Sequence, residues 1–211
     1  MKKAIVVDFD GTFVKVNSFE LFAKYLVFFS ISHINFRLFA FLFLELLKRK
    51  FRLESHEELK KHILFYLKNN CIDNVLSTFL ICLKSYVNDD VLNRLRKWKQ
   101  EEYIIVLSSA APEYYLKYFI QQYPDLFDYT LSTPTPKSNQ DLSWNENIRE
   151  IKCKRTVTFL QINNLEFTFF LTDHYDDIPL LKVHKSKNIL ISPSNYTIEK
   201  LTKNNVKFEI L

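Results

Sequence analysis

The sequence predicts an α/β fold, a Rossmann-like parallel sheet with helices on both faces and an inserted all-helical segment. Short apolar runs alternate with helical patterns along most of the chain, which is typical of parallel strands joined by helical crossovers. The first run, AIVV at 4–7, is apolar on both faces, as a strand inside such a sheet requires. The alternation is interrupted only by residues 15–87, which carry helical patterns without strands.

The later strands and helices follow in alternation. YIIVL at 103–107 predicts the second strand, and Pro112 then opens a helix through Tyr123, as proline in a first helical turn often does. Residues 133–147, rich in Pro, Ser, Asn and Thr, predict a loop or a flap-like hairpin. Further strands are expected at 129–132, 167–171, 188–191 and 206–210, and further helices at 89–102 and 151–162.

The interruption predicts two domains. We expect a catalytic core made of residues 1–14 and 88–211, and a helical cap made of residues 15–87. Within the cap, a long aromatic stretch from about Ser18 to Lys50 is followed by two amphipathic patterns, one around Leu59–Leu67 and one around Leu76–Leu83.

Composition limits the function classes. The chain has 211 residues, 47% of them hydrophobic, which is enough for a core and excludes general disorder. Its net charge of +5 comes from scattered rather than clustered lysines, so we expect no nucleic-acid partner. A small anionic substrate or an anionic membrane surface suits this charge better. The three cysteines, Cys71, Cys82 and Cys153, lack metal-ligand spacing and predict reduced, mostly buried thiols in a cytoplasmic protein.

Polar residues follow three of the expected strands. Ligands of open α/β sheets bind beyond the carboxyl ends of the strands, so these residues should meet at one edge. The chain's only glycine, Gly11, is among them, where a backbone must turn tightly or approach a ligand. The set comprises Asp8, Asp10, Gly11 and Thr12 after the first strand, Ser108 and Ser109 after the second, and Asp173, Asp176 and Asp177 after the fourth, with Lys152 and Lys154 on the helix before it.

This combination of groups suits phosphoryl transfer. Clustered carboxylates repel one another unless a cation is present, and oxygen ligands favour Mg²⁺. One carboxylate can attack phosphorus while a second exchanges protons with the leaving oxygen and with water. Hydroxyl and ammonium groups can hold the equatorial phosphate oxygens.

Three segments resemble motifs of the haloacid dehalogenase superfamily. VVDFDGTFV at 6–14 is similar to its first motif, VLSSAAPEYY at 106–115 to its second, and FFLTDHYDDIPLL at 169–181 to its fourth. The helical insert after the first motif resembles the cap of the phosphoserine-phosphatase-like branch. This resemblance covers most of the core and implies a Mg²⁺-dependent phosphatase that works through an aspartyl-phosphate.

The resemblance also implies residue roles. Asp8 would be the nucleophile and a metal ligand. Asp10 would be the general acid/base, with its backbone carbonyl on the metal. Asp173 would be a further metal ligand, and Asp177 would orient a metal-bound water or the lysine. Ser109, three residues before Pro112, would bind phosphate together with Gly11, Thr12 and Lys152.

Two assignments stay open. Ser108 is the alternative to Ser109. Lys154 is the alternative to Lys152, because the run NIREIKCKR at 147–155 lacks the glycine that the branch shows before its lysine. Asp10 itself favours phosphatase or phosphomutase chemistry, because the family's dehalogenases lack the second aspartate.

Two other functions are compatible with the same residues. A phosphotransferase or phosphomutase would pass the phosphoryl group to an organic acceptor. A catalytically silent domain would serve as a binding or membrane-associated module, although its buried acids would be costly without a metal.

The Phe-rich stretch has its own alternatives. Residues 19–47 contain no uninterrupted apolar run of about 18 residues, so we expect buried cap helices rather than a membrane span. An amphipathic hairpin on a membrane surface is the alternative. Some members of the resembled branch with a similarly apolar cap act on lipid phosphates, so the substrate is expected to be a small organic or a lipid-linked phosphate.

Overall fold

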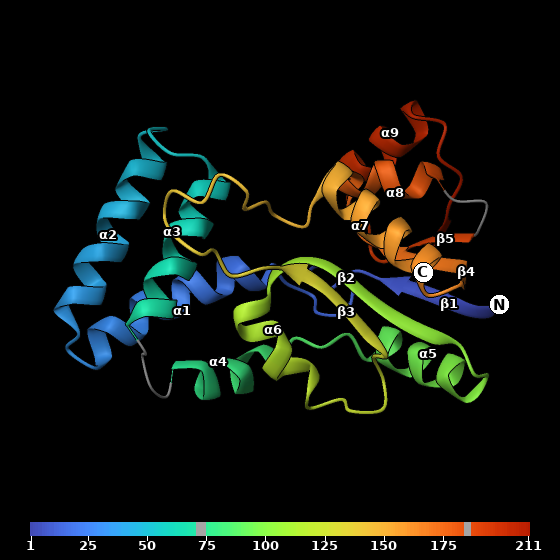
Figure 1. Ribbon diagram of the computed structural model, residues 1–211, viewed down its shortest axis with the longest axis horizontal. Helices are drawn as coiled ribbons and strands as arrows, with labels where there is room; N and C mark the ends of the chain where they lie inside the picture. Colours follow the sequence, from blue (N-terminus) through green and yellow to red (C-terminus); the bar gives the residue numbers. More distant parts are fainter. Residues whose placement is uncertain (71–74, 184–186) are drawn as a thin grey trace.

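A parallel six-stranded sheet forms the centre of the computed structural model, which describes residues 1–70, 75–183 and 187–211 (Figure 1). The strand order is β3-β2-β1-β4-β5-β6, and every neighbouring pair is parallel. The strands are β1 (Lys2–Val7), β2 (Ile104–Pro112), β3 (Tyr129–Thr133), β4 (Leu165–Thr172), β5 (Lys187–Leu190) and β6 (Glu209–Ile210). The predicted fold class is thereby confirmed.

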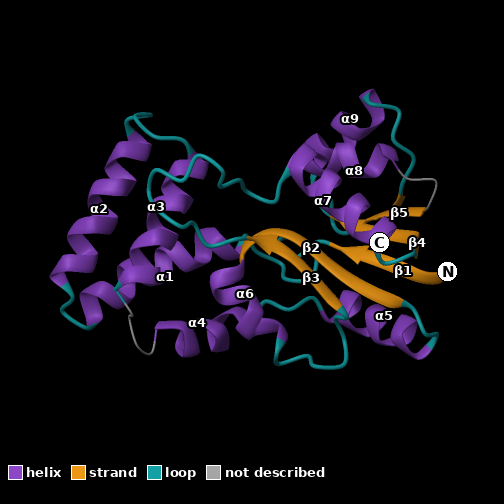
Figure 2. Cartoon of the chain, viewed as in Figure 1, coloured by secondary structure: helices purple, strands orange, loops and turns teal. Residues whose placement is uncertain are grey.

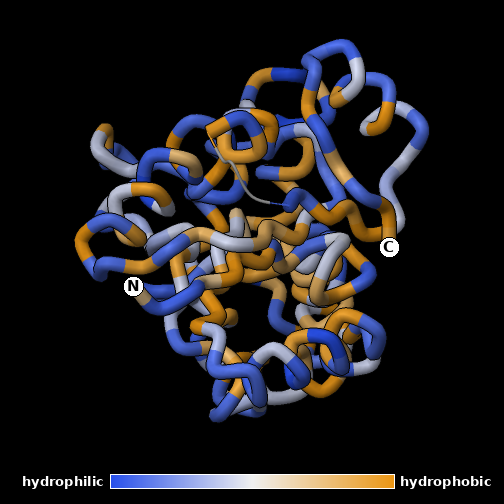
Figure 3. Tube along the Cα trace, turned by 90° about the vertical axis from the view of Figure 1, so that its right-hand side faces the viewer, coloured by the Kyte–Doolittle hydropathy of each residue, from blue (hydrophilic) through white to orange (hydrophobic). Residues whose placement is uncertain are grey.

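Two helical layers cover the sheet, one on each face. Successive residues of a strand point to opposite faces, so the apolar side chains of β1 are divided between the two layers. Ile5 and Val7 of β1 face the layer of α5 and α6, whereas Ala4 and Val6 face the layer of α7, α8 and α9. Figure 2 shows the strands between these layers, and Figure 3 shows hydrophobic segments gathered near the centre of the molecule. The helices are α5 (Asp89–Gln100), α6 (Glu113–Ile120), α7 (Arg149–Ile162), α8 (Ile178–Val183) and α9 (Asn195–Lys203), with a 3₁₀ turn at Tyr175–Asp177.

Among the described residues, five helices lie between β1 and β2 in the chain. The last is α5, which covers the sheet, and the first four are α1 (Ser18–Ser32), α2 (Phe36–Lys50), α3 (His56–Asn69) and α4 (Val75–Lys84). The aromatic stretch expected at 18–50 is therefore two helices, separated at Ile34, whose φ of 52° no helix accommodates. Asn35 then caps α2 by accepting a hydrogen bond from Leu38 N at 3.0 Å. We keep the name cap for residues 15–87.

The chain enters and leaves the cap side by side. Asn88 N donates to Phe13 O at 2.8 Å and Lys15 N donates to Tyr86 O at 2.8 Å, so segments 13–15 and 86–88 lie together. In Figure 1, α1, α2 and α3 extend beyond one end of the sheet. The division between core and cap, at 14/15 and 87/88, stays a prediction.

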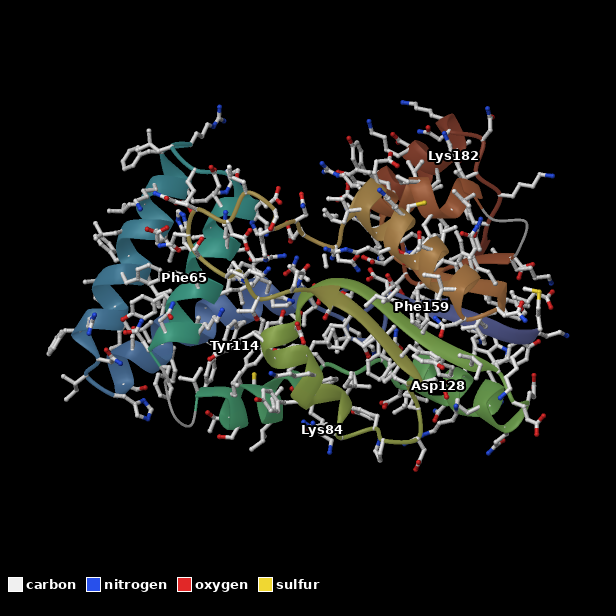
Figure 4. All side chains as sticks on the ribbon, viewed as in Figure 1. Phe65, Lys84, Tyr114, Asp128, Phe159 and Lys182 are labelled. Atoms are coloured by element: carbon white, nitrogen blue, oxygen red, sulfur yellow. The ribbon has the colours of Figure 1, made fainter. Side chains whose placement is uncertain are left out.

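Loop 134–148 extends from β3 to α3 of the cap and back to α7 (Figure 1). It is an irregular loop rather than a hairpin. Lys61 and Lys68 of α3 donate to its carbonyl oxygens, at 2.6 Å to Asp141 O and 3.3 Å to Pro136 O. Figure 4 shows side chains filling the space between the loop and the cap helices. The loop thus joins the cap to the core a second time.

Two further expectations from the sequence, on the cysteines and on membrane spans, can be compared with the structure. Cys153 is buried and Cys82 is half-buried, both as free thiols, and Cys71 lies outside the described residues. Within the described part of the chain, no helix is long and apolar enough to span a membrane.

Candidate active site

The sheet brings three strand ends to one place. Val7 of β1 is paired with Leu107 of β2 on one side and with Leu171 of β4 on the other. Parallel strands in this register end at the same edge, so Asp8, Ser109 and Asp173 line one cavity there. The cavity has a volume of about 390 Å³, and its wall also includes Asp10, Gly11, Asn147, Lys152, Asp176 and Asp177.

Lys152 is the central cation of this cavity. Its Nζ lies 2.9 Å from Asp8 Oδ1 and 2.8 Å from Asp177 Oδ2, and its side chain is 4% exposed. Burial alone would lower the pKa of Lys152, but the carboxylates of Asp177 and Asp8 raise it above its usual value. Thr172 Oγ1 also donates to Asp177 Oδ2 at 2.6 Å, so Asp177 holds the lysine against the Asp8 carboxylate.

The alternative lysine lies elsewhere. Lys154 lines a separate groove beside β3 and α7, with Thr130 and Phe159, because two residues along a helix turn a side chain by about 200°. Of the two lysines left open by the sequence, the structure brings Lys152 to the acids.

The Asp173 side chain packs closely against the turn that follows Asp8. Gly11 has a φ of 69°, and a Cβ built on it would lie 2.1 Å from Asp173 Oδ2. Thr12 Oγ1 donates to Asp173 Oδ1 at 3.4 Å, and Thr12 is fully buried and does not line the cavity. Gly11 is therefore required for both its conformation and its lack of a side chain, and Thr12 contacts Asp173 rather than the cavity.

We expect Gly11→Ala to displace Asp173. Alanine in the left-handed region costs about 1–2 kcal/mol, and its Cβ occupies the place of the carboxylate. Asparagine tolerates this backbone conformation better but brings the same Cβ. Gly11→Asn should thus lose less unfolding free energy in urea titrations than Gly11→Ala, while both variants lose activity. Wild-type activity in either variant would show that Asp173 need not stay in place.

Asp10 is hydrogen-bonded to the start of α1. Its Oδ1 accepts a hydrogen bond from Ser18 N at 2.9 Å, while the Ser18 hydroxyl lies 2.7 Å from the Tyr115 hydroxyl in the core. Burial raises the pKa of Asp10, and the hydrogen bonds from Ser18 oppose that rise. A raised pKa favours the protonated form of this carboxyl group, as the role of proton donor requires.

The two serines of the second strand have different surroundings. Ser109 lines the cavity, and its Oγ accepts a hydrogen bond from Ala111 N at 3.0 Å. Ser108 faces α7 instead, with its Oγ 2.8 Å from Thr156 Oγ1. Ser109 is therefore the serine that can meet a ligand in the cavity.

Asn147 is a cavity residue that the sequence reasoning missed. It is fully buried, and its Nδ2 donates to Ser109 O and Leu131 O, both at 3.0 Å. Its Oδ1 has no partner among the described residues. Asn147 lies in loop 134–148, where an isolated asparagine gives no sequence signal that separates it from its neighbours.

Lys60 of the cap was also missed, although its pattern could have revealed it. It stands on the same helical face as Ile63, Leu64 and Leu67, an unusual place for a lysine. Its Nζ contacts the carboxylate of Glu146 in loop 134–148 and lies 4.8 Å from the Phe19 ring centroid. Burial lowers the pKa of Lys60 to about 8. The pair links α3 to the loop beside the cavity.

The family model for haloacid dehalogenase-like hydrolases matches residues 5–182. The chain belongs to this family. The expected enzyme class, a hydrolase of this family, is thereby confirmed. No curated protein matches the chain.

Solved structures with a similar fold agree with this family assignment. A protein of unknown function from Bordetella pertussis Tohama I has a TM-score of 0.76 at 13% identity, over 99% of this chain and 98% of that one. A probable phosphoserine phosphatase from Vibrio cholerae has a TM-score of 0.70 at 12% identity, over 94% of this chain and 59% of that one. A substrate-bound phosphoserine phosphatase has a TM-score of 0.60 at 15% identity, over 95% and 90%. The haloacid dehalogenase-like chain therefore has the fold of the phosphoserine-phosphatase-like branch.

The cavity of this hydrolase has the donor set that a hard cation needs. Burial raises the pKa of Asp8 to about 8 and that of Asp173 to about 6, and the nearby Asp177 carboxylate contributes to both increases. Asp177 is held by both Lys152 and Thr172, whereas Asp8 contacts Lys152 through Oδ1 alone, so Asp8 and Asp173 are the candidate ligands for a cation. Oxygen donors of this kind fit Mg²⁺, with the Asp10 backbone carbonyl as a further candidate ligand.

Proposed function

We propose that this protein is a Mg²⁺-dependent phosphatase that hydrolyses a phosphomonoester through an aspartyl-phosphate at Asp8. The observation that carries the proposal is the buried arrangement of Asp8, Lys152 and Asp177, with the Asp8 carboxylate 2.9 Å from the ammonium group and open to the cavity. Such an arrangement orients the Asp8 side chain beside a fixed positive charge that also attracts phosphate, and a bound Mg²⁺ would keep the carboxylate ionised.

In the first half-reaction, an Asp8 oxygen forms a bond to phosphorus as the ester P–O bond breaks. Asp10 donates its proton to the leaving oxygen, which departs as an alcohol. Lys152 and the Ser109 hydroxyl bind the equatorial oxygens, where transition-state charge is spread. A bound Mg²⁺, held by Asp8, Asp173 and the Asp10 carbonyl, supplies positive charge that offsets the repulsion between carboxylate and phosphate.

In the second half-reaction, a water oxygen forms a bond to phosphorus as the Asp8–phosphorus bond breaks. Asp10, now ionised, takes the proton from that water and so regains its starting state. Inorganic phosphate leaves and the Asp8 carboxylate is restored. The contacts of α3 with loop 134–148 keep the cap over the site, which limits access of bulk water during these steps.

The first test is hydrolysis of an aryl phosphate by the purified protein, with Mg²⁺ and with EDTA. We expect turnover that requires Mg²⁺. Addition of an alcohol should leave free phosphate as the main product; a phosphorylated alcohol would indicate a phosphotransferase instead. If folded protein gives no turnover, Mg²⁺-dependent capture of beryllofluoride at Asp8 would still support the site, whereas no capture would indicate a silent domain.

Metal-free protein should lose stability as the pH rises. The pKa values of Asp8 and Asp173 are raised to about 8 and about 6, so the folded state holds protons that the unfolded state has released. Their stabilising contribution is complete below about pH 4 and is lost as the pH passes through about 6 and 8. Scanning calorimetry in EDTA should show this fall, and Mg²⁺ should raise Tm more at about pH 8 than at about pH 5. An equal Mg²⁺ effect at both values would contradict the assignment of Asp8 and Asp173 as ligands.

We further propose that the ester carries an apolar group. A second cavity of about 550 Å³ lies within the cap and shares Asn17 with the catalytic cavity. Its walls are mainly apolar, so an ester bound at Asp8 could extend its alcohol part into it. The lining residues are Asn17, Phe19, Glu20, Ala23, Lys24, Val27, Leu46, His56 and Leu59.

Chain-length dependence tests this substrate class. Each methylene that leaves water contributes about 0.8 kcal/mol, so kcat/KM for alkyl phosphates should rise about threefold to fourfold per added methylene. Ala23→Phe should fill the cap cavity and flatten that dependence while the shortest substrate is still hydrolysed. The substrate class would be wrong if phosphoserine were the better substrate and chain length had no effect.

The outer face of α2 supports peripheral contact with an anionic membrane. This helix exposes Phe36 and Phe43, at 76% and 52%, yet buries Glu45, which inverts the usual arrangement. Lys48, Arg49 and Lys50 follow at its C-terminal end. An apolar face flanked by basic residues is typical of a helix that lies in a membrane interface.

Vesicle flotation tests this contact. Wild-type protein should float with vesicles that contain anionic lipid and much less with neutral vesicles. The double variant Phe36→Ser/Phe43→Ser should stay in the soluble fraction. Ile162→Ser, which removes a 78% exposed apolar residue at the end of α7, is the matched control and should float like wild type. The proposal would be wrong if wild-type protein stayed in the soluble fraction with both vesicle types.

A further inference from the structure

A second group of metal-ligating side chains lies in the cap. Glu45 of α2, Glu54 of the turn before α3 and His62 of α3 each place one donor atom within 4.8 Å of the others. Both glutamates are buried, at 5% and 7% exposure. His62 is two residues from Lys60, about 200° around α3, so it faces α2 rather than the catalytic cavity.

Within this group, the surroundings of Glu54 indicate that a cation is missing. Its side chain is 5% exposed, and neither of its oxygens has a hydrogen-bond partner among the described residues. His62 Nδ1 lies 2.9 Å from Glu54 Oε1, but the same nitrogen lies 2.7 Å from Glu45 Oε2. One imidazole nitrogen carries at most one proton, and here the hydrogen bond is made to Glu45.

Charge adds to the need for a cation. Among the described residues, Glu45 is the one carboxylate that pairs with Lys48, whose side chain is 47% exposed and can turn into solvent. Two buried carboxylates with oxygens within 4.8 Å of each other are unfavourable unless a cation or a shared proton lies between them.

The spacing of the donor atoms fits metal coordination. Two ligands that bind a metal at 90° with bonds of about 2.0–2.1 Å lie about 2.9 Å apart. His62 Nδ1 lies 2.7 Å and 2.9 Å from the two carboxylates. Imidazole together with two carboxylates favours a first-row transition metal over Mg²⁺ or Ca²⁺, which prefer oxygen alone.

We propose that Glu45, Glu54 and His62 form a site for a divalent first-row transition metal, for which Zn²⁺ is the probe. The three residues come from α2, the 51–55 turn and α3, so the bound ion ties these parts of the cap together. This site does not depend on the proposed phosphatase activity.

Calorimetric titration of metal-free protein with Zn²⁺, in excess Mg²⁺ to cover the catalytic acids, tests the site. We expect one Zn²⁺ per chain and a higher Tm in its presence. Glu54→Gln and His62→Gln should each weaken binding at least about 100-fold, because each removes one of three ligands. His33→Gln changes an exposed cap histidine outside the cluster and should bind like wild type.

Co²⁺ gives a second readout that does not rely on stability. Visible absorption bands of bound Co²⁺ should appear with wild type and His33→Gln and be absent with His62→Gln, whose fold is checked by circular dichroism. If either Glu54→Gln or His62→Gln fails to fold, the metal binding of the other variant decides the test. Zn²⁺ affinity that is unchanged in both ligand variants, or absent in wild type, would overturn the proposal and leave His62 as a hydrogen-bond donor between two acids.

Discussion

Asp8→Asn is expected to slow hydrolysis of any phosphomonoester by at least about 10⁴-fold, because loss of a nucleophile removes the covalent route entirely. The amide keeps the size of the side chain but cannot attack phosphorus. It also removes the negative charge that faces Lys152 at 2.9 Å. Asp177 still pairs with Lys152, so the buried ammonium retains one carboxylate and the fold should persist.

Steady-state kinetics with Mg²⁺ and circular dichroism check this result. Asp176→Asn is the matched control, because Asp176 lines the same cavity but pairs with Arg149 at 2.9 Å. Its activity should stay close to wild type. Folded Asp8→Asn protein that keeps most of its activity would mean that another group attacks phosphorus.

Asp10→Asn is expected to slow steady-state turnover by about 10²–10⁴-fold, the usual contribution of a general acid or base. The two half-reactions should differ in this variant. An aryl leaving group needs little protonation, so Asp8 still becomes phosphorylated, whereas the attacking water loses its base. An alkyl phosphate needs protonation and should not reach the first intermediate.

Rapid-mixing experiments separate these steps. With an aryl phosphate, Asp10→Asn should release one equivalent of phenol per active site in a burst and then turn over slowly. With an alkyl phosphate no burst is expected. Equal losses on both substrates, without a burst, would contradict the role of Asp10 and leave it a structural partner of Ser18 N.

The sheet and the strand-end residues could be predicted because both depend on local patterns. AIVV at 4–7 is apolar at every position, and the structure pairs β1 on both sides. Asp8 and Asp173 directly follow paired strands, so their convergence follows from the register alone. The family match then confirmed the expected class of protein, while the individual roles stay predictions.

The parts that escaped prediction depend on contacts distant in sequence. Lys60 and Glu146 meet across 86 positions; the apolar helical face marks Lys60 as unusual, but nothing in the sequence indicates that Glu146 is its partner. Asn147 acquires its place only when loop 134–148 folds back against β2 and β3. Helices were expected in the Phe-rich stretch, but the position of the break at Ile34 could not be located, because it rests on a positive φ at a non-glycine residue. The cap cluster likewise requires α2 and α3 to pack before its ligands meet.

The most direct measurement of the central claim is identification of the phosphorylated residue. Protein mixed with substrate and Mg²⁺ is quenched in acid during turnover and reduced with borohydride, which converts an aspartyl-phosphate to homoserine. Mass spectrometry of the peptides should find homoserine at position 8 and at no other aspartate, and EDTA should abolish it. Turnover without reduction at position 8, or with reduction at another aspartate, would contradict the account.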